Sequence, residues 1–284
     1  MRYLLLVLSF FVEFTVYAQE KAIAKVHYIF EHVNDTAQHE QPLVFETITY
    51  LGNIGSFFTE GSTLNAQEVM RKQFLSANFD GNIVIEKRAD PLRNYYIIIP
   101  SKAEIFEVHN IAGENFVTKT DYDVPSWTIE DDTSTIGGYL CQKAVTTFKG
   151  RNYTAWFTVE LPFSFGPWKL HGLPGLILAA KDDKEEVTFK YGGFEKVDSE
   201  DAKLIAAPEN TISAKPEEII RLKTAYEENP SAYFKSRESV RRSGTSSGAN
   251  TSKDWDARKI KSISIKNAEN YRPSKNTNNP IELP

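Results

Sequence analysis

The chain lacks the cysteines on which many small exported proteins depend for stability. Cys141 is its only cysteine in 284 residues, so disulfide bonds within the chain are excluded and an ordinary hydrophobic core must stabilise the fold. We expect Cys141 to be a small buried strand residue, because it does not begin a helix that would lower its pKa. A reactive thiol is the alternative.

Recognisable catalytic and metal-binding patterns are also missing. The sequence has no G-x-S-x-G motif, and a pairing of Cys141 with His171 is the one candidate for nucleophilic catalysis. Its five histidines show no His-x-His or Cys/His ligand spacing. His27 and His32 would point to opposite faces of one strand. We therefore expect no catalytic residue, no metal and no cofactor, with a hydrolase as the least favoured function.

Long apolar runs are confined to the N-terminus. Residues 1–18 combine Arg2, an apolar stretch at 4–14 and the sequence Val16-Tyr17-Ala18, which predicts a signal peptide cleaved before Gln19. A membrane anchor is the alternative, but the apolar stretch is shorter than the roughly 20 residues that span a bilayer. We expect an exported mature chain without a transmembrane segment.

Positive charge is concentrated at the C-terminus. The chain has a net charge of −5, whereas residues 231–284 contain 11 Lys/Arg and 5 Asp/Glu. An acidic body with a basic, Ser/Asn-rich tail is not typical of nucleic-acid-binding proteins, and a tail with few large apolar residues is typical of disorder. The expected organisation is a signal peptide at 1–18, one β-rich domain at 19–230 and a disordered tail at 231–284.

Short β-strand patterns recur about every ten residues through the body, separated by Gly, Pro and Asp turn signals. We expect strands at 24–33, 42–51, 82–87, 94–100, 103–111, 115–122, 141–150, 153–161, 176–182 and 186–197. Helical patterns occur at 65–75 and 215–230. The fold class is therefore mainly β: an antiparallel, strongly curved sheet of half-barrel or barrel type with one or two short helices.

The most unusual stretch is FGPWKLHGLPGLILAA, residues 165–180. Gly166-Pro167 and Pro174-Gly175 are turn formers, with Gly172 between them. Pro174 suits position i+1 of a type II turn, and Gly175 suits position i+2, where φ is positive. The apolar side chains between the turns must either fill the interior or form an exposed patch.

This stretch also carries a family resemblance. Residues 136–178 read IGGYLCQKAVTTFKGRNYTAWFTVELPFSFGPWKLHGLPGLIL. They resemble the signature of the GLPGLI family, exported proteins of unknown function from Bacteroidetes-type bacteria. Trp168-Lys169-Leu170 departs conservatively from the family pattern. The resemblance covers about residues 22–195 and implies the envelope of a Gram-negative bacterium, either the periplasm or the outer membrane and cell surface.

The favoured function is an exported, non-enzymatic binding or accessory protein that holds an apolar or peptide ligand, or an envelope protein partner. Aromatic side chains dominate such binding sites. The candidate ligand- or partner-binding residues are Trp156, Trp168, Lys169, His171, Leu173 and Arg151. In the alternative, both tryptophans are core residues and the 165–176 loop plugs the barrel of a purely structural or interaction module.

Asp35-Thr36-Ala37 resembles the Asp-Ser/Thr-apolar sites that the same bacterial group uses for O-glycosylation. A three-residue pattern occurs often by chance. Thr36 is therefore a hypothesis for a modified residue.

Overall fold

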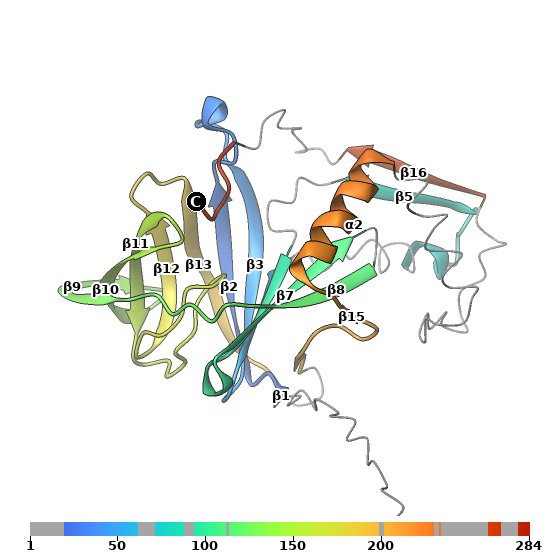
Figure 1. The fold of residues 1–284 in the computed structure, drawn as a ribbon. Helices are drawn as coiled ribbons and strands as arrows, with labels where there is room; N and C mark the ends of the chain where they lie inside the picture. Colours follow the sequence, from blue (N-terminus) through green and yellow to red (C-terminus); the bar gives the residue numbers. More distant parts are fainter. Residues whose placement is uncertain are drawn as a thin grey trace, which may run out of the picture.

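A computed structural model describes residues 20–61, 72–87, 94–111, 114–198, 202–229, 233, 261–267 and 278–284. The expected signal peptide at 1–18 and most of the expected helix at 65–75 lie outside these residues. The protein is mainly β, as expected from the sequence (Figure 1).

The strands are β1 (Glu20–Lys21), β2 (Ala24–His32), β3 (Leu43–Leu51), β4 (Ser56–Glu60), β5 (Asn82–Lys87), β6 (Asn94–Ile99), β7 (Glu104–Ile111), β8 (Glu114–Thr120), β9 (Thr128–Ile136), β10 (Tyr139–Phe148), β11 (Arg151–Thr158), β12 (Leu176–Asp182), β13 (Val187–Lys196), β14 (Leu204–Ile205), β15 (Ile212–Ser213) and β16 (Ser262–Asn267). The helical elements are η1 (Thr36–Gln38), η2 (Pro100–Lys102) and α2 (Pro216–Glu228).

One sheet of twelve strands forms the body. Its order is β15-β8-β7-β6-β4-β3-β2-β13-β12-β11-β10-β9. All neighbours pair antiparallel except β15, which adds to β8 in parallel. Two meanders meet where β2 pairs with β13. One consists of β2, β3, β4, β6, β7 and β8, and the other runs from β9 to β13. The expected antiparallel meander is thus confirmed, with β8 and β9, which are consecutive in the chain, at distant places in the strand order.

Alternation along the strands separates a core face from an outer face. In β2 the even-numbered residues are buried, whereas the odd-numbered ones are partly or fully exposed. His27 and His32 therefore lie on opposite faces, as expected. In β11, Tyr153, Ala155 and Phe157 are buried. The strand ends at Thr158, before the end predicted at 161, and Val159 beyond it is 64% exposed.

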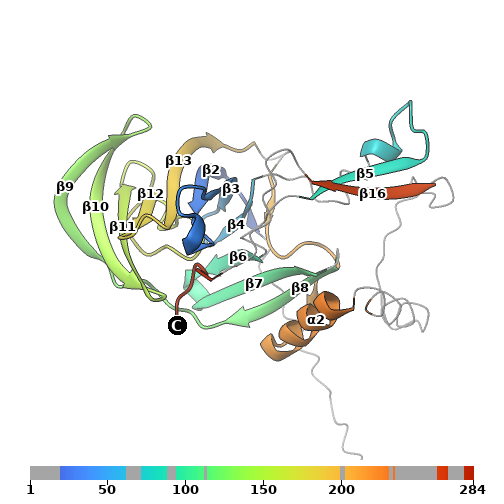
Figure 2. The same cartoon turned by 90° about the horizontal axis from the view of Figure 1, so that it is seen from above.

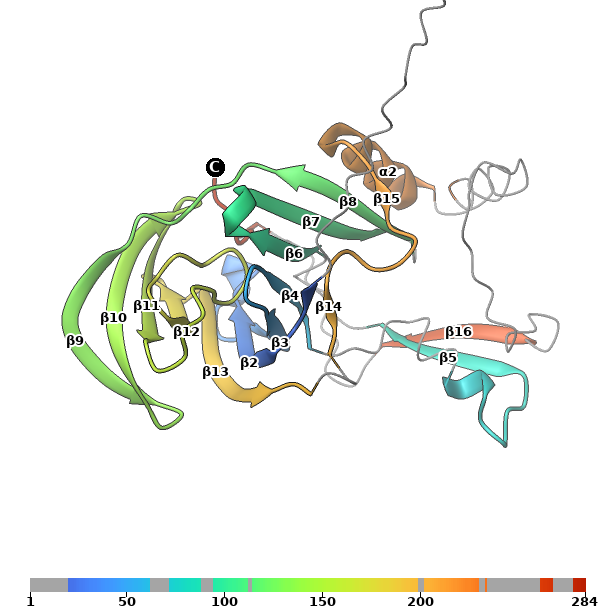
Figure 3. The same cartoon turned by 90° about the horizontal axis from the view of Figure 1, so that it is seen from below.

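Two smaller sheets flank the body. β1 pairs with β14, a contact best seen in Figure 3, and β16 pairs in parallel with β5. Helix α2 begins at the expected proline, and the side chain of Glu218 accepts a hydrogen bond from the Lys215 backbone N–H, 2.8 Å away. Such a contact satisfies one of the N–H groups that a helix start leaves open.

The expectation of a disordered tail is wrong for two segments. Residues 262–267 form β16, and residues 278–284 contact the main sheet through several hydrogen bonds. The average composition of 231–284 concealed them, because SISIKN has strand-like alternation and NNPIELP carries apolar residues on either side of its acid. No helix among the described residues has both the length and the apolar character to cross a membrane.

Candidate functional site

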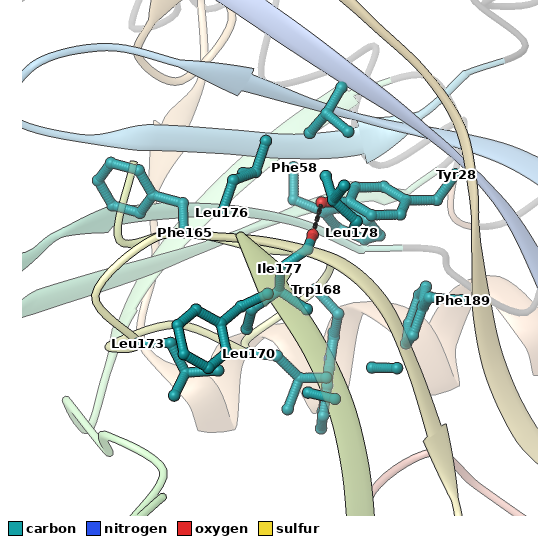
Figure 4. Packing of buried hydrophobic residues seen from close by; sticks show 14 of the residues in the cluster. Tyr28, Phe58, Phe165, Trp168, Leu170, Leu173, Leu176, Ile177, Leu178 and Phe189 are labelled. Atoms are coloured by element: carbon teal, nitrogen blue, oxygen red, sulfur yellow. Dashed lines mark hydrogen bonds between the residues drawn. The ribbon is translucent and has the colours of Figure 1, made fainter. Parts of the chain in front are cut away.

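The loop between β11 and β12 lies inside the core rather than on the surface (Figure 4). The large apolar side chains at positions 165–176 are all buried: Phe165, Trp168, Leu170, Leu173 and, at the first position of β12, Leu176. The Trp168 ring lies edge-on to Phe148 at 5.8 Å and tilted against Tyr153 at 6.2 Å, measured between ring centroids. The loop therefore supplies much of the main hydrophobic core.

Hydrogen bonds from distant parts of the chain hold this loop and the start of β12. The Tyr28 hydroxyl donates to the carbonyl of Ile177 at 2.6 Å, and Thr49 donates to the carbonyl of Gly166 at 3.0 Å. The Trp127 indole donates to the carbonyl of His171 at 2.8 Å. Burial raises the pKa of Tyr28 well above its ordinary value. The phenol consequently remains a donor at physiological pH, and irregular backbone inside the core stays hydrogen-bonded.

Gly166 and Gly175 are needed for close packing rather than for a turn conformation. Gly172 has φ +92°, but Gly175 is not in the left-handed region, so the expected type II turn with positive φ at Gly175 is wrong. Gly175 is required for space instead: a Cβ there would lie 2.1 Å from the carbonyl oxygen of Thr158. A Cβ at Gly166 would similarly lie 2.8 Å from the carbonyl oxygen of Leu170. Pro167 and Pro174 lie in the same loop, outside any helix or strand.

The candidate binding residues do not share one surface. Alternation along β11 places Trp156 on the face opposite Tyr153, whereas Trp168 contacts Tyr153 inside the core. Leu173 is buried. His171 is also buried, which lowers its pKa, and its Nδ1 lies 2.8 Å from the Lys169 carbonyl oxygen.

Cys141 is buried, as expected, and burial raises the pKa of its thiol. Its Sγ lies 3.6 Å from the Tyr139 carbonyl oxygen, whereas the His171 ring packs against Tyr122, with ring centroids 5.6 Å apart. Each side chain thus has its own neighbours, and a raised thiol pKa disfavours the thiolate that a nucleophile requires.

Arg151 is the centre of a buried charged cluster. Its guanidinium donates to Asp182 at 2.6 Å and to Glu186 at 3.1 Å, and only 1% of its side chain is exposed. The other oxygen of Asp182 accepts hydrogen bonds from the backbone N–H groups of Glu186 and Val187. The turn between β12 and β13 therefore fixes both carboxylates around the guanidinium.

Residues 278–284, here called the C-terminal segment, complete this cluster. Arg151 also donates to the Asn279 side-chain oxygen at 2.6 Å and to the carbonyls of Pro280 and Ile281 at 2.7 and 2.9 Å. In Figure 2 the segment lies between strands β10–β13 and strands β6–β8. The Asn278 side-chain oxygen accepts from the Thr36 backbone N–H at 3.0 Å, and the Asn278 side-chain nitrogen donates to the Thr36 hydroxyl at 2.9 Å. The candidate modified residue therefore already has a partner.

Lys169 connects the segment to the loop. Its ammonium lies 2.5 Å from a carboxylate oxygen of Glu282 and 4.9 Å from the centroid of the Tyr96 ring, and the residue is 6% exposed. Of the six predicted binding residues, Arg151 and Lys169 therefore both contact the C-terminal segment.

A second polar network lies on β6, β7 and β8. Asn94 contacts both Glu107 and His109, and Thr118 lies 3.1 Å from His109 Nε2. Burial raises the pKa of Glu107. Burial, followed by Lys223 and Lys169, lowers the pKa of His109 to about 4.

A carboxyl group with raised pKa beside a neutral imidazole is typical of acid–base sites. Here both His109 ring nitrogens are engaged within the fold, by Asn94 and Thr118, so the network joins strands rather than presenting a base. Among the described residues no group of three His, Cys, Asp or Glu side chains is arranged to hold a metal ion.

Sequence reasoning missed the C-terminal segment and the Glu107–His109 network. Asn279 lies far from Arg151 in the chain, and without the fold nothing links them. The alternation in 103–111 did place Glu107 and His109 on one face of a strand. That shared face was the available signal, but it gave no information on burial or on Asn94.

A family described as "Protein of unknown function (Porph_ging)" matches residues 145–179. This match spans the end of β10, strand β11, the buried loop and the start of β12. It overlaps the stretch that carries the sequence resemblance over residues 145–178 and includes the Gly-Leu-Pro-Gly string.

Two solved structures titled as PNGF-II, in space groups P21 and C2, are similar to the chain at 14% and 15% identity, with TM-scores of 0.48 and 0.47. Each similarity covers 71% of this chain, which spans about a third of the PNGF-II chains, at 32%. Likeness at this level is no evidence of a shared activity. No curated protein matches the sequence.

Gly175→Ala is expected to destabilise the protein by about 3 kcal/mol, because the new Cβ must displace the backbone of Thr158 within the core. Gly138→Ala is the matched control. Nothing lies within 4 Å of its Cβ, and its φ of +89° predicts a smaller cost of about 1–2 kcal/mol. Urea unfolding measures both, and a Gly175→Ala cost no larger than the Gly138→Ala cost contradicts the packed loop.

His32 predicts acid sensitivity. Among the described residues neither of its buried ring nitrogens has a hydrogen-bond partner. Burial lowers the pKa of His32 from 6.5 to about 4, and the nearby Asn279 backbone opposes this decrease only in part. Between these values the unfolded state binds more protons, so stability falls with falling pH. The loss attributable to His32 from pH 7 to pH 5 is about 2 kcal/mol.

His32→Phe is expected to remove that loss, since Phe fills a similar space beside Phe30 and does not titrate. Urea unfolding at pH 7 and pH 5 gives the measurement, with the exposed His39→Gln as control. An unchanged pH dependence in His32→Phe is the contradicting result.

Proposed function

We propose that this chain is an exported envelope protein of the GLPGLI type that acts as a non-enzymatic interaction module for a protein partner. The observation that supports this function is the burial of the 165–176 loop. In a carrier of apolar ligands, the inner face of the sheet would hold the cargo. Here Trp168, Leu170 and Leu173 occupy that face, so binding is assigned to the outside of the fold.

We also propose that the main sheet is strongly curved. Thr120 ends β8 and Thr128 begins β9, so the connecting chain spans at most roughly 29 Å. In a flat sheet the ten spacings from β8 to β9 would separate them by roughly 48 Å. Bending that brings β9 toward β8 reconciles the two lengths and gives the loop an interior to fill.

Contacts of the loop support the same curvature. Trp168 packs against Phe148 of β10 and Tyr153 of β11, while the adjacent Lys169 lies over Tyr96 of β6. Five strands separate β6 from β11 in the sheet order. Two consecutive residues reach both only if the sheet bends around them.

Export is supported by the sequence of residues 1–18 and by the resemblance of residues 136–178 to a family of exported proteins. We place the mature protein in the periplasm or at the outer membrane of a Gram-negative bacterium, where an envelope protein would be its partner. A hydrolase is not favoured, because Cys141 has a raised thiol pKa and both ring nitrogens of His109 are occupied.

A fluorescent apolar dye such as bis-ANS separates the interaction module from the carrier. If the chain is an interaction module, the dye does not fluoresce with the native protein, and Trp168→Ala increases the dye emission several-fold by opening a cavity in the core. For a carrier, the native protein binds the dye and Trp168→Ala weakens that binding.

Trp156→Ala is the control, because Trp156 is only partly buried where it packs against the core, so its removal leaves a smaller cavity than removal of the fully buried Trp168. Dye binding to the native protein that Trp168→Ala abolishes would overturn the proposed function.

A further inference from the structure

The C-terminal segment contacts the body as a bound peptide would. None of its residues is in a strand or helix, and its partners come from four separate parts of the chain. They are Val33, Thr36, Lys149, Arg151, Lys169 and Glu186, here called the Arg151 site. Side chains of the Arg151 site, rather than a strand ladder, therefore determine which sequence fits.

Asn279 is recognised at both ends of its amide. Its oxygen accepts from Arg151 at 2.6 Å, and its nitrogen donates to the Val33 carbonyl at 2.7 Å and to Glu186 at 3.0 Å. The residue is 5% exposed. Aspartate has no donor for those two acceptors, so the Arg151 site selects asparagine.

The following positions are also matched. Pro280 contributes a carbonyl to Arg151 and has no N–H to leave unpaired. Glu282 pairs with Lys169. The Leu283 N–H donates to the Lys149 carbonyl at 3.0 Å, and its Cβ would lie 2.6 Å from a Cβ at Gly150. Gly150 leaves the space in which that leucine lies.

The body holds Arg151 in place independently of the segment. Asp182 and Glu186 remain on the guanidinium, and backbone N–H groups fix Asp182. The guanidinium N–H groups of Arg151 that contact Asn279, Pro280 and Ile281 would then remain directed at a replacement peptide. A preorganised site loses little freedom when it binds, which favours affinity for a short segment.

We propose that the Arg151 site is a recognition site for extended peptides of Asn-Pro-apolar-acid sequence, and that the C-terminal segment occupies it reversibly. The inference rests on the proposed interaction function. Hydrogen bonds, one ion pair and the partly buried Ile281 hold the segment, and no strand ladder joins it to the sheet, so it opens as a local unit without unfolding the core. Covalent attachment gives it an effective concentration of the order of millimolar, and the segment therefore excludes weak competitors.

A fluorescein-labelled peptide with the sequence of residues 278–284 tests recognition on full-length chains. In the chain, Asn279→Ala with Glu282→Ala weakens the resident segment, and we expect this variant to bind the peptide at least tenfold more tightly than the wild type. A peptide carrying Asn279→Asp should bind the same variant at least tenfold more weakly, and a scrambled peptide should not compete.

Equal binding of the scrambled peptide, or no binding to a variant with the wild-type circular dichroism spectrum, would overturn the proposal. Neither result depends on the apolar dye, so failure of the Arg151 site is distinguishable from failure of the interaction function.

Amide hydrogen exchange of the wild-type chain gives a second test that needs no variant. The N–H groups of Asn279 and Leu283 bond to Asn34 and Lys149. We expect both to exchange at least a hundredfold faster than the Ala155 amide in the centre of the sheet. Exchange at the rate of Ala155 means that the segment leaves only on global unfolding, and the proposal is then wrong.

Discussion

Burial of the 165–176 loop against the inner face of the main sheet is the contact on which the rest of the structure depends. The loop gives Trp168 and four other large apolar side chains to the core and receives hydrogen bonds from Thr49 and Trp127, while Tyr28 donates to Ile177 of β12 directly after the loop. Each backbone group that the loop would otherwise bury unpaired costs about 1–3 kcal/mol. Glycines at 166 and 175 allow the close backbone contacts. The Gly-Leu-Pro-Gly string is thus explained by packing.

A charged cluster performs the corresponding role at the end of the sheet where the C-terminal segment lies. Arg151 is surrounded by two carboxylates from one turn and three oxygens from the C-terminal segment. Removing one partner of a buried ion pair typically costs about 3–5 kcal/mol. The carboxylates exceed the guanidinium by one charge, and Lys169 pairs with Glu282 beside them. This polar boundary of the core is where the C-terminal segment contacts the body.

The strands and the late helix could be predicted from the sequence, because alternation and turn residues act locally. Single residues were less predictable. The sequence suggests Arg151 and Lys169 as ligand-binding residues, whereas each contacts a residue more than 100 positions away in the chain. Gly175 was assigned to a turn because Pro-Gly is a local signal, whereas its actual constraint is the carbonyl of Thr158. Composition failed for 278–284, since seven residues that make specific contacts disappear in the average of a polar tail.

Native mass spectrometry of the protein purified from its own envelope fraction, without added ligand, tests the central claim most directly. The account predicts either the mass of the bare mature chain or that mass plus a protein partner, because loop side chains already fill the interior. A small apolar molecule that stays bound during gentle ionisation and dissociates on denaturation would contradict the account and identify the protein as a carrier.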